Sequence, residues 1–410
     1  MFVPNDVNKM LDLLETRGYS AYIVGGCVRD SYLSLRPKDY DICTSATPDQ
    51  VKQVFKEYDI YDTGIKHGTL TVAGEEDFYE VTTYRIDGEY KDNRHPESVK
   101  FVDNIELDLA RRDFTINAIA YSPKRGLKDP YNGTEDLKNG IIKCVGNAND
   151  RFKEDALRIL RAIRFATRYH FDIENKTKEA MFNNMSLLNG VAQERKTSEF
   201  LQILHNISKD EFLKYQDIFN QFIPLDQIKD LSERAALIAN LKDDYEKMAV
   251  LFQGTDYFNI LKSLKLSNEM IGNISSLIEA QSEPTKADKV SLKKVMRKIG
   301  PDLTRGAINI KLHKHLLNND EQKAELARKS FALIDEIVKN KEPYMTKDLC
   351  INGSDLMEIG YNGPEIGKEL DRLTNVIIEN PELNTKEDLF QISERDFSNK
   401  IEKDSHCHDI

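Results

Sequence analysis

The sequence feature that most constrains the fold is the stretch SAYIVGGCVRDSYLSLRPKDYDI, which begins at Ser20. A run of β-forming residues from Ala21 to Val24 is followed at once by Gly25 and Gly26. Asp39 and Asp41 follow two residues apart, and side chains at i and i+2 of a strand point to the same face. The stretch therefore predicts a strand, a tight turn into a helix, and a second strand that presents two carboxylates side by side.

Paired carboxylates in this setting indicate a metal-assisted phosphate chemistry. Two like charges repel unless a cation lies between them, and hard oxygen ligands suit Mg²⁺, which is usually bound together with substrate phosphates. A double glycine lets the backbone approach a phosphate, while the following helix N-terminus and Arg29 supply positive potential. An isolated Asp-x-Asp also fits a solvated turn or a helix cap, so the prediction of a nucleoside triphosphate site depends on the ordered set.

A third carboxylate lies in the next predicted strands. HGTLTVAG and FYEVTTY, between residues 60 and 83, are expected to join the same sheet, and Glu80 lies within the second. A third carboxylate beside the first two suits a two-metal site, in which two cations stabilise the attacking and leaving oxygens of an in-line displacement. By itself Glu80 equally fits a solvated glutamate on an edge strand. The polar stretch 84–98, YRIDGEYKDNRHPES, is expected to form a mobile loop.

From residue 150 the pattern changes to amphipathic helices almost to the end. Basic residues recur every three or four positions within EDALRILRAIRFATR, at Arg158, Arg161, Arg164 and Arg168. Asp155 lies three residues before Arg158, so the spacing predicts one face of a single helix. Such a stripe can be a solvated face of salt bridges. Because apolar residues crowd the rest of this helix, the stripe is expected to line a cleft.

Composition limits the possible partners. A chain of 410 residues predicts two to four domains. No apolar run approaches the roughly 18 residues needed to span a membrane, and the first ten residues lack a signal-peptide pattern, so a cytoplasmic protein is expected. The net charge of −11 argues against nucleic-acid binding over the whole surface. Any RNA contact must be local, and segment 286–298, with six basic residues and one acidic residue, is either a phosphate-binding patch or a solvated face.

The five cysteines have no CxxC spacing, which argues against a disulfide framework or a zinc site. The thiols are expected to be reduced and mostly buried. The ending SHCHDI, with His406, Cys407 and His408, is given no role.

Seven motifs in order resemble the bacterial class II tRNA nucleotidyltransferases, the CCA-adding enzymes of the poly(A) polymerase family. They are GGCVRD with DYD, EVTTYR, RRDFTINA, DPYNGTEDL, EDALRILRAIRFA, ERKTSE and INGSDL. The resemblance covers essentially the whole chain. It implies an α+β fold: a polymerase-beta-like nucleotidyltransferase head with a small mixed sheet over 1–149, then an all-helical neck (150–204), body (205–300) and tRNA-binding tail (301–410).

The resemblance also implies an activity: addition of C, C and A to the 3′ end of tRNA from CTP and ATP, without a template and with release of diphosphate. It implies Mg²⁺ on Asp39 and Asp41, with Glu80 as the third carboxylate. Triphosphate and sugar contacts fall on Gly26, Arg29 and Arg112, with Asp113 as a ribose partner. Base reading falls on Asp155 and Arg158, helped by Glu154, Arg161 and Arg164. The implied partners are CTP, ATP and the tRNA acceptor arm, bound by a monomer or a homodimer.

Two other functions stay open. A bacterial poly(A) polymerase shares the head and neck motifs, but such enzymes tend to be basic overall. A non-catalytic RNA-binding scaffold is disfavoured by the intact Asp39, Asp41 and Glu80. The His-Asp pair at His408 and Asp409 lies at the chain end, so phosphatase activity is not expected, and the full-length segment 84–98 favours addition of both C and A.

Overall fold

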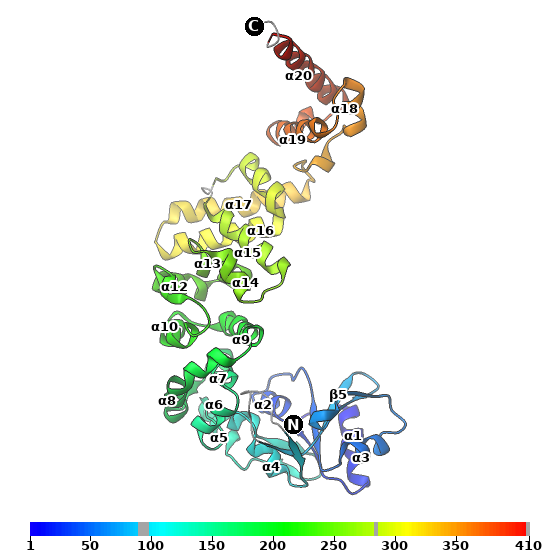
Figure 1. Cartoon of the computed structure of the whole chain (residues 1–410), viewed down its shortest axis with the longest axis vertical. Helices are drawn as coiled ribbons and strands as arrows, with labels where there is room; N and C mark the ends of the chain where they lie inside the picture. The colour runs from blue at the N-terminus through cyan, green and yellow to red at the C-terminus, as the bar shows by residue number, and fades with distance from the viewer. Residues whose placement is uncertain (89–97, 283–285, 407–410) are drawn as a thin grey trace. The chain divides into compact units, whose positions relative to one another are not determined.

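The computed structural model describes residues 1–88, 98–282 and 286–406 (Figure 1). The chain divides into two compact units. One unit comprises residues 1–227 with 263–265, and the other comprises 228–262 with the chain from 266 onward. The central part of the expected mobile loop, 89–97, lies outside the described residues, as do the chain-end residues Cys407, His408 and Asp409. The finer division into head, neck, body and tail stays a prediction.

The first unit contains a seven-stranded sheet. Its strands, in spatial order, are β3 (Ile60–Gly64), β4 (Thr69–Ala73), β5 (Phe78–Thr83), β2 (Asp41–Thr44), β1 (Ala21–Val24), β8 (Ala120–Ser122) and β9 (Gly126–Lys128). β2 and β5 run parallel, whereas the other neighbours run antiparallel. The expected small mixed sheet is confirmed.

Helices α1 (Asn5–Thr16) and α3 (Pro48–Val54) pack on one face of this sheet. Alternate strand residues fill that face, so Leu70, Val72 and Val81 are fully buried. On β5 the intervening residues Phe78 and Glu80 are exposed. This period of two leaves the opposite face of β3, β4 and β5 open.

The ends of α1 and α3 follow the sequence signals. Gly18 adopts φ of 87°, which a glycine accepts without a steric penalty, and α1 stops two residues earlier. Pro48 occupies the first turn of α3, and the Gln50 side chain accepts a hydrogen bond from the backbone N–H of Thr47 at 2.9 Å. Residues within one turn of each boundary therefore account for the end of α1 and the start of α3.

Smaller elements complete the first unit. Two short ribbons pair β6 (Arg85–Asp87) with β7 (Val99–Phe101) and β10 (Ile141–Ile142) with β11 (Asp172–Ile173). The helices are α2 (Gly26–Tyr32), α4 (Ile105–Ala110), α5 (Gly133–Asn139), α6 (Ala148–Glu154), α7 (Leu157–Tyr169), α8 (Asn175–Asn184), α9 (Gln193–Asn206), α10 (Lys209–Lys214) and α11 (Gln216–Phe219). The expected loop 84–98 thus contains β6 near its start and is followed directly by β7, the strand that pairs with β6.

One expectation for the neck is wrong. A single helix was expected to carry Asp155 and Arg158 on one face, but α6 ends at Glu154 and α7 begins at Leu157. Asp155 between them has extended backbone angles, φ −144° and ψ 103°, and its carboxylate accepts from the Leu157 N–H at 3.0 Å. An aspartate favours this capping geometry over a helix interior, and the spacing of three therefore does not represent one helical turn.

The second unit is helical. It contains α12 (Leu231–Asn240), α13 (Asp244–Phe252), α14 (Tyr257–Ser263), α15 (Asn268–Ser282), α16 (Lys289–Leu317), α17 (Glu321–Lys339), α18 (Gly353–Ile359), α19 (Pro364–Glu379) and α20 (Lys386–His406). α16 is kinked at Gly300, with φ of 81°, immediately before Pro301. In the described parts of the chain no helix is long and apolar enough to cross a membrane.

Candidate active site

Two of the predicted carboxylates lie on neighbouring strands. β2 and β5 pair with Ile42 opposite Val81, so the preceding residues, Asp41 and Glu80, are also neighbours. Adjacent strands are about 4.8 Å apart. Asp39 lies in the irregular segment before β2, so strand alternation does not position it as expected. The parallel pairing of β2 with β5, rather than the Asp-x-Asp spacing, brings Asp41 beside Glu80.

The electrostatics show that the three carboxylates share one environment. Desolvation raises the pKa of Glu80, and the charges of Asp41 and Asp39 raise it further, although its side chain is partly exposed. Desolvation likewise raises the pKa of Asp41, where Arg112 opposes the shift and Asp39 adds to it. In the described part of the chain, no salt bridge joins these three acids to a basic side chain. The cluster therefore carries negative charge that no ion pair within the described residues neutralises.

The donor chemistry fits a hard divalent cation. Three carboxylates supply only oxygen ligands, and their mutual repulsion is what a cation between them would relieve. Within residues 1–88, 98–282 and 286–406, no three His, Cys, Asp or Glu side chains converge closely enough to form a complete metal cage. A site of this kind needs further ligands, which phosphate oxygens and water would supply.

The glycine turn lies beside the carboxylates, because Val24 pairs with Asp41 and Gly25 follows directly. Gly25 has φ of 71°, and a Cβ there would lie 2.9 Å from Nη1 of Arg112. At Gly26 a Cβ would be only in ordinary contact, 3.6 Å from Nη2 of Arg29. The turn therefore requires glycine at position 25, whereas the predicted contact residue Gly26 opens α2.

Arg112 lies between the turn and the acids. Asp108, fully buried four residues earlier, holds its Nη2 at 3.3 Å. Its buried Nε has no hydrogen-bond partner among the residues that the structure describes. Asp108 was not singled out from the sequence, although it lies on α4 four residues before Arg112, which follows the end of that helix, and a spacing of four brings side chains together along a helix.

Arg29 is buried, 6% exposed, in contacts within the protein. Its Nε donates to Asp30 at 2.9 Å and its Nη1 donates to Asn117. Its guanidinium also stacks over Phe165 and Tyr169 of α7, about 5 Å from each ring centroid. Through these ring contacts Arg29 connects α2 to α7.

Asp113 makes a second connection to α7. Its carboxylate accepts from Nε of Arg161 at 2.8 Å and from the Asn117 amide at 3.0 Å. Burial would raise the pKa of Asp113, but Arg161 and Asn117 outweigh it and hold the pKa well below its usual range. Asn117, which the sequence analysis did not single out, thus bridges Arg29 and Asp113 within the RRDFTINA motif.

Arg158 and Arg164 of the stripe are also paired. Arg158 donates to Glu154 at 2.7 Å and to the carbonyl of Arg111 at 3.2 Å. Arg164 lies 3.3 Å from Glu199 on α9. Asp155 points instead to Arg195 on α9, at 3.0 Å. Asp155 and Arg158 were expected to act together on one edge of a base. In the structure each of them instead binds a different partner.

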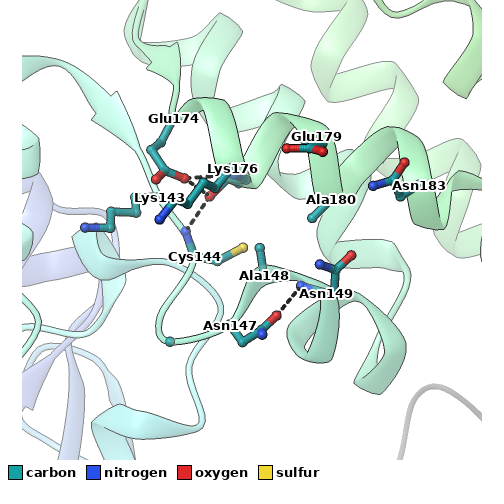
Figure 2. Close-up of a pocket in the computed structure, with 12 residues that line it drawn as sticks. Lys143, Cys144, Asn147, Ala148, Asn149, Glu174, Lys176, Glu179, Ala180 and Asn183 are labelled. Atoms are coloured by element: carbon teal, nitrogen blue, oxygen red, sulfur yellow. Dashed lines mark hydrogen bonds between the residues drawn. The ribbon is translucent and has the colours of Figure 1, made fainter.

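A cavity of about 720 Å³ lies elsewhere, between residues 143–149 and α8 (Figure 2). Lys143, Lys176 and Asn183 line it, and none of the predicted site residues does. The Thr177 hydroxyl at its wall already accepts from the Cys144 N–H and donates to Glu174. The concentration of charge on the sheet, and not this cavity, defines the candidate site.

Comparisons with known proteins give three family matches along the chain. Residues 21–143 match the Poly A polymerase head domain, 170–214 match the probable RNA and SrmB-binding site of polymerase A, and 247–392 match the putative tRNA nucleotidyltransferase domain 2. The chain is 34% identical to the CCA-adding enzyme of Bacillus velezensis over 392 residues, which covers 93% of this chain and 95% of that one. It is 34% identical to the CCA-adding enzyme of Ligilactobacillus salivarius over 425 residues, covering 97% and 99%.

Among solved structures, the chain is similar to the crystal structure of the Bacillus stearothermophilus CCA-adding enzyme in complex with CTP. The TM-score is 0.81 at 27% sequence identity, with 98% of this chain and 100% of that chain covered.

Proposed function

Because the chain belongs to the CCA-adding enzyme family, we propose that it adds C, C and A to the 3′ end of tRNA by nucleotidyl transfer at Asp39, Asp41 and Glu80. CTP and ATP are the substrates, diphosphate is released, and no nucleic-acid template takes part. The observation that carries this proposal is the parallel register of β2 and β5, which puts Asp41 beside Glu80 next to the Gly25 turn.

The acids have two roles. Asp39 and Asp41 would hold Mg²⁺, which when bound neutralises phosphate charge and stabilises the attacking and leaving oxygens. Glu80, on the neighbouring strand, would orient the incoming 3′ hydroxyl of the RNA.

The triphosphate lies on the other side of Asp41, at the glycine turn. Gly25 allows close approach of a phosphate, and Gly26, Arg29 and Arg112 are the proposed contacts. Of the two arginines, Arg112 has the unpartnered donor, since its buried Nε bonds to no described group. Arg29 contributes by fixing the helix that follows the turn.

Base selection is proposed for Asp155 and Arg158, supported by Arg161 and Arg164. Aspartate accepts from the exocyclic amine of cytosine or adenine and arginine donates to the adjacent ring nitrogen, whereas uracil and guanine present the opposite pattern. Each oxygen of Asp155 accepts one bond here, from Leu157 and from Arg195, and a carboxylate has about four acceptor sites. A second acceptor position on each oxygen is therefore available for a base.

One assay tests the proposal. The purified chain is given Mg²⁺ and a tRNA that lacks its last three nucleotides, with CTP, ATP or both. Growth by two C residues and one A supports CCA addition. A long A tail would indicate a poly(A) polymerase, and no growth would indicate a scaffold. The expected monomer or homodimer and the cytoplasmic location stay predictions.

A further inference from the structure

Two aromatic side chains stand on the open face of the sheet next to the carboxylates. Tyr61 on β3 is 47% exposed and Phe78 on β5 is 61% exposed. Their rings contact each other edge to face, with centroids 5.8 Å apart and planes at 66°. Because the two rings touch, they form a continuous aromatic patch, and contiguous exposed patches are the kind of apolar surface that marks a binding site.

The register fixes where this pair lies relative to the site. Tyr61 pairs with Thr71, and Thr71 pairs with Glu80, so the three residues form one row on one face of the sheet. Two strand spacings put Tyr61 about 10 Å from Glu80 along the row. Phe78 precedes Glu80 by two residues on β5 and so shares its face.

The proposed reaction predicts the path that the RNA takes across this row of residues. In an in-line displacement the attacking and leaving groups lie on opposite sides of the reacting phosphorus. The triphosphate occupies the β1 side, at Gly25, and the attacking hydroxyl approaches from the β5 side, at Glu80. The RNA behind that hydroxyl must then run on over β4 and β3, where Tyr61 and Phe78 lie.

The charges nearby favour bases over phosphates. Glu75, Glu76 and Asp77 form the turn immediately before Phe78, and Asp62 follows Tyr61. Lys52 already pairs with Asp62 at 2.8 Å. Acidic groups repel a phosphate backbone, whereas an aromatic face stacks on any base.

We infer that Tyr61 and Phe78 form a stacking platform for the unpaired bases just behind the 3′ terminus of the acceptor RNA. This inference rests on the proposed function and adds to it a determinant of acceptor binding. The platform holds the RNA end so that its hydroxyl meets Glu80, and it takes no part in selecting the incoming nucleotide.

The test uses the full chain and a tRNA lacking its last two nucleotides, with 2-aminopurine as the unpaired base just before the terminal C. The double variant Tyr61→Ala/Phe78→Ala is expected to raise the KM for RNA about tenfold, the loss of a stacked base, and to leave the KM for CTP unchanged. The fluorescence of 2-aminopurine, quenched by stacking on the native protein, should recover in this variant. Tyr61→Phe/Phe78→Tyr keeps both rings and should retain the native KM and quenching.

Leu127→Ala is the matched control, because Leu127 is 45% exposed on β9 at the opposite edge of the same sheet. An unchanged KM and unchanged quenching in the Ala double variant would overturn the platform while the native activity stands. An equal rise in KM for Leu127→Ala would overturn it as well. If the native chain adds no nucleotide to any acceptor, the proposed function itself fails.

Discussion

The carboxylates on the sheet and the arginines of α7 are two charged regions of the first unit, and they differ in how their charges are paired. Each arginine at 158, 161 and 164 lies against a carboxylate of the same chain, Glu154, Asp113 or Glu199. Asp39, Asp41 and Glu80 have no such ion pair within the described residues. Charge that the fold leaves uncompensated indicates an external ligand, whereas compensated charge first of all holds the fold together.

The largest expected effect comes from removing one uncompensated charge. Asp41→Asn should lower nucleotide incorporation at least about a hundredfold, because the cation and with it the triphosphate are no longer held. A raised carboxylate pKa means that the ionised form is disfavoured in the folded state, so the same variant should melt at a higher temperature than the native protein without metal at neutral pH. Added Mg²⁺ should raise the melting temperature of the native protein only.

Asp59→Asn provides the control, since Asp59 is an exposed carboxylate just before β3. It should change neither incorporation nor the response to Mg²⁺. If Asp41→Asn keeps more than about a hundredth of native turnover, the Asp41 carboxylate is not required for catalysis, and its lack of an ion pair does not mark an active site.

Breaking a compensated pair should cost stability instead. Arg161→Gln leaves the Asp113 carboxylate buried without its main partner, which should lower the free energy of unfolding by about 3 kcal/mol at pH 7. The pKa of Asp113 is depressed, so its contribution is present above about pH 4, the unfolded pKa, and is lost as the pH falls. Urea titrations should show the difference between native and variant shrinking below that pH.

Arg168→Gln is the matched substitution on the same helix, because Arg168 is exposed and lies over the Tyr169 ring. Its effect on unfolding should be small at every pH. If the free energy of unfolding lost in Arg161→Gln does not change with pH, the packing of Arg161, and not its ion pair with Asp113, provides the stability.

Asp155 combines the properties of both regions, because it forms an ion pair within the protein and is also proposed to bind a base. Asp155→Ala should slow addition of C and A and lower the CTP to UTP ratio of kcat/KM about tenfold, one lost base-edge contact. Arg195→Ala removes the partner at 3.0 Å and leaves the carboxylate in place, so it should keep the ratio. If both variants keep the native ratio, Asp155 serves only to cap α7 and to hold α9.

The smallest effect is expected in the second unit, where the basic segment 286–298 is compensated as well. Lys294 lies 2.7 Å from Glu379, Arg297 pairs with Asp371, and Lys293 lies 2.9 Å from Glu342. Lys294→Ala breaks a pair that is about half exposed and should change the unfolding free energy by less than about 1 kcal/mol. The slope of log tRNA affinity against log salt concentration should stay unchanged in this variant. A slope reduced by about one phosphate contact would instead support the phosphate-binding interpretation of segment 286–298.

The sequence alone determined what depends on short spacings. The strand at Ala21 to Val24, the strand with Glu80 and the Pro48 helix start follow from side-chain period, turn residues and caps, which act within a few positions. The mixed sheet and the helical remainder were expected from the family resemblance and are confirmed.

The tertiary structure alone decided which charges meet. Asp113 and Arg161 are 48 residues apart, and Arg29 and Asn117 are 88 apart, so neither pairing follows from local periodicity. Asp155 lies between α6 and α7 and not inside a helix. In this position its carboxylate accepts from the Leu157 N–H and pairs with Arg195, which satisfies it better than a position inside a helix would. Glu80 came to lie beside Asp41 because β2 and β5 pair in parallel. A local pattern fixes the face on which a side chain lies, but only the packing of distant elements fixes what that face meets.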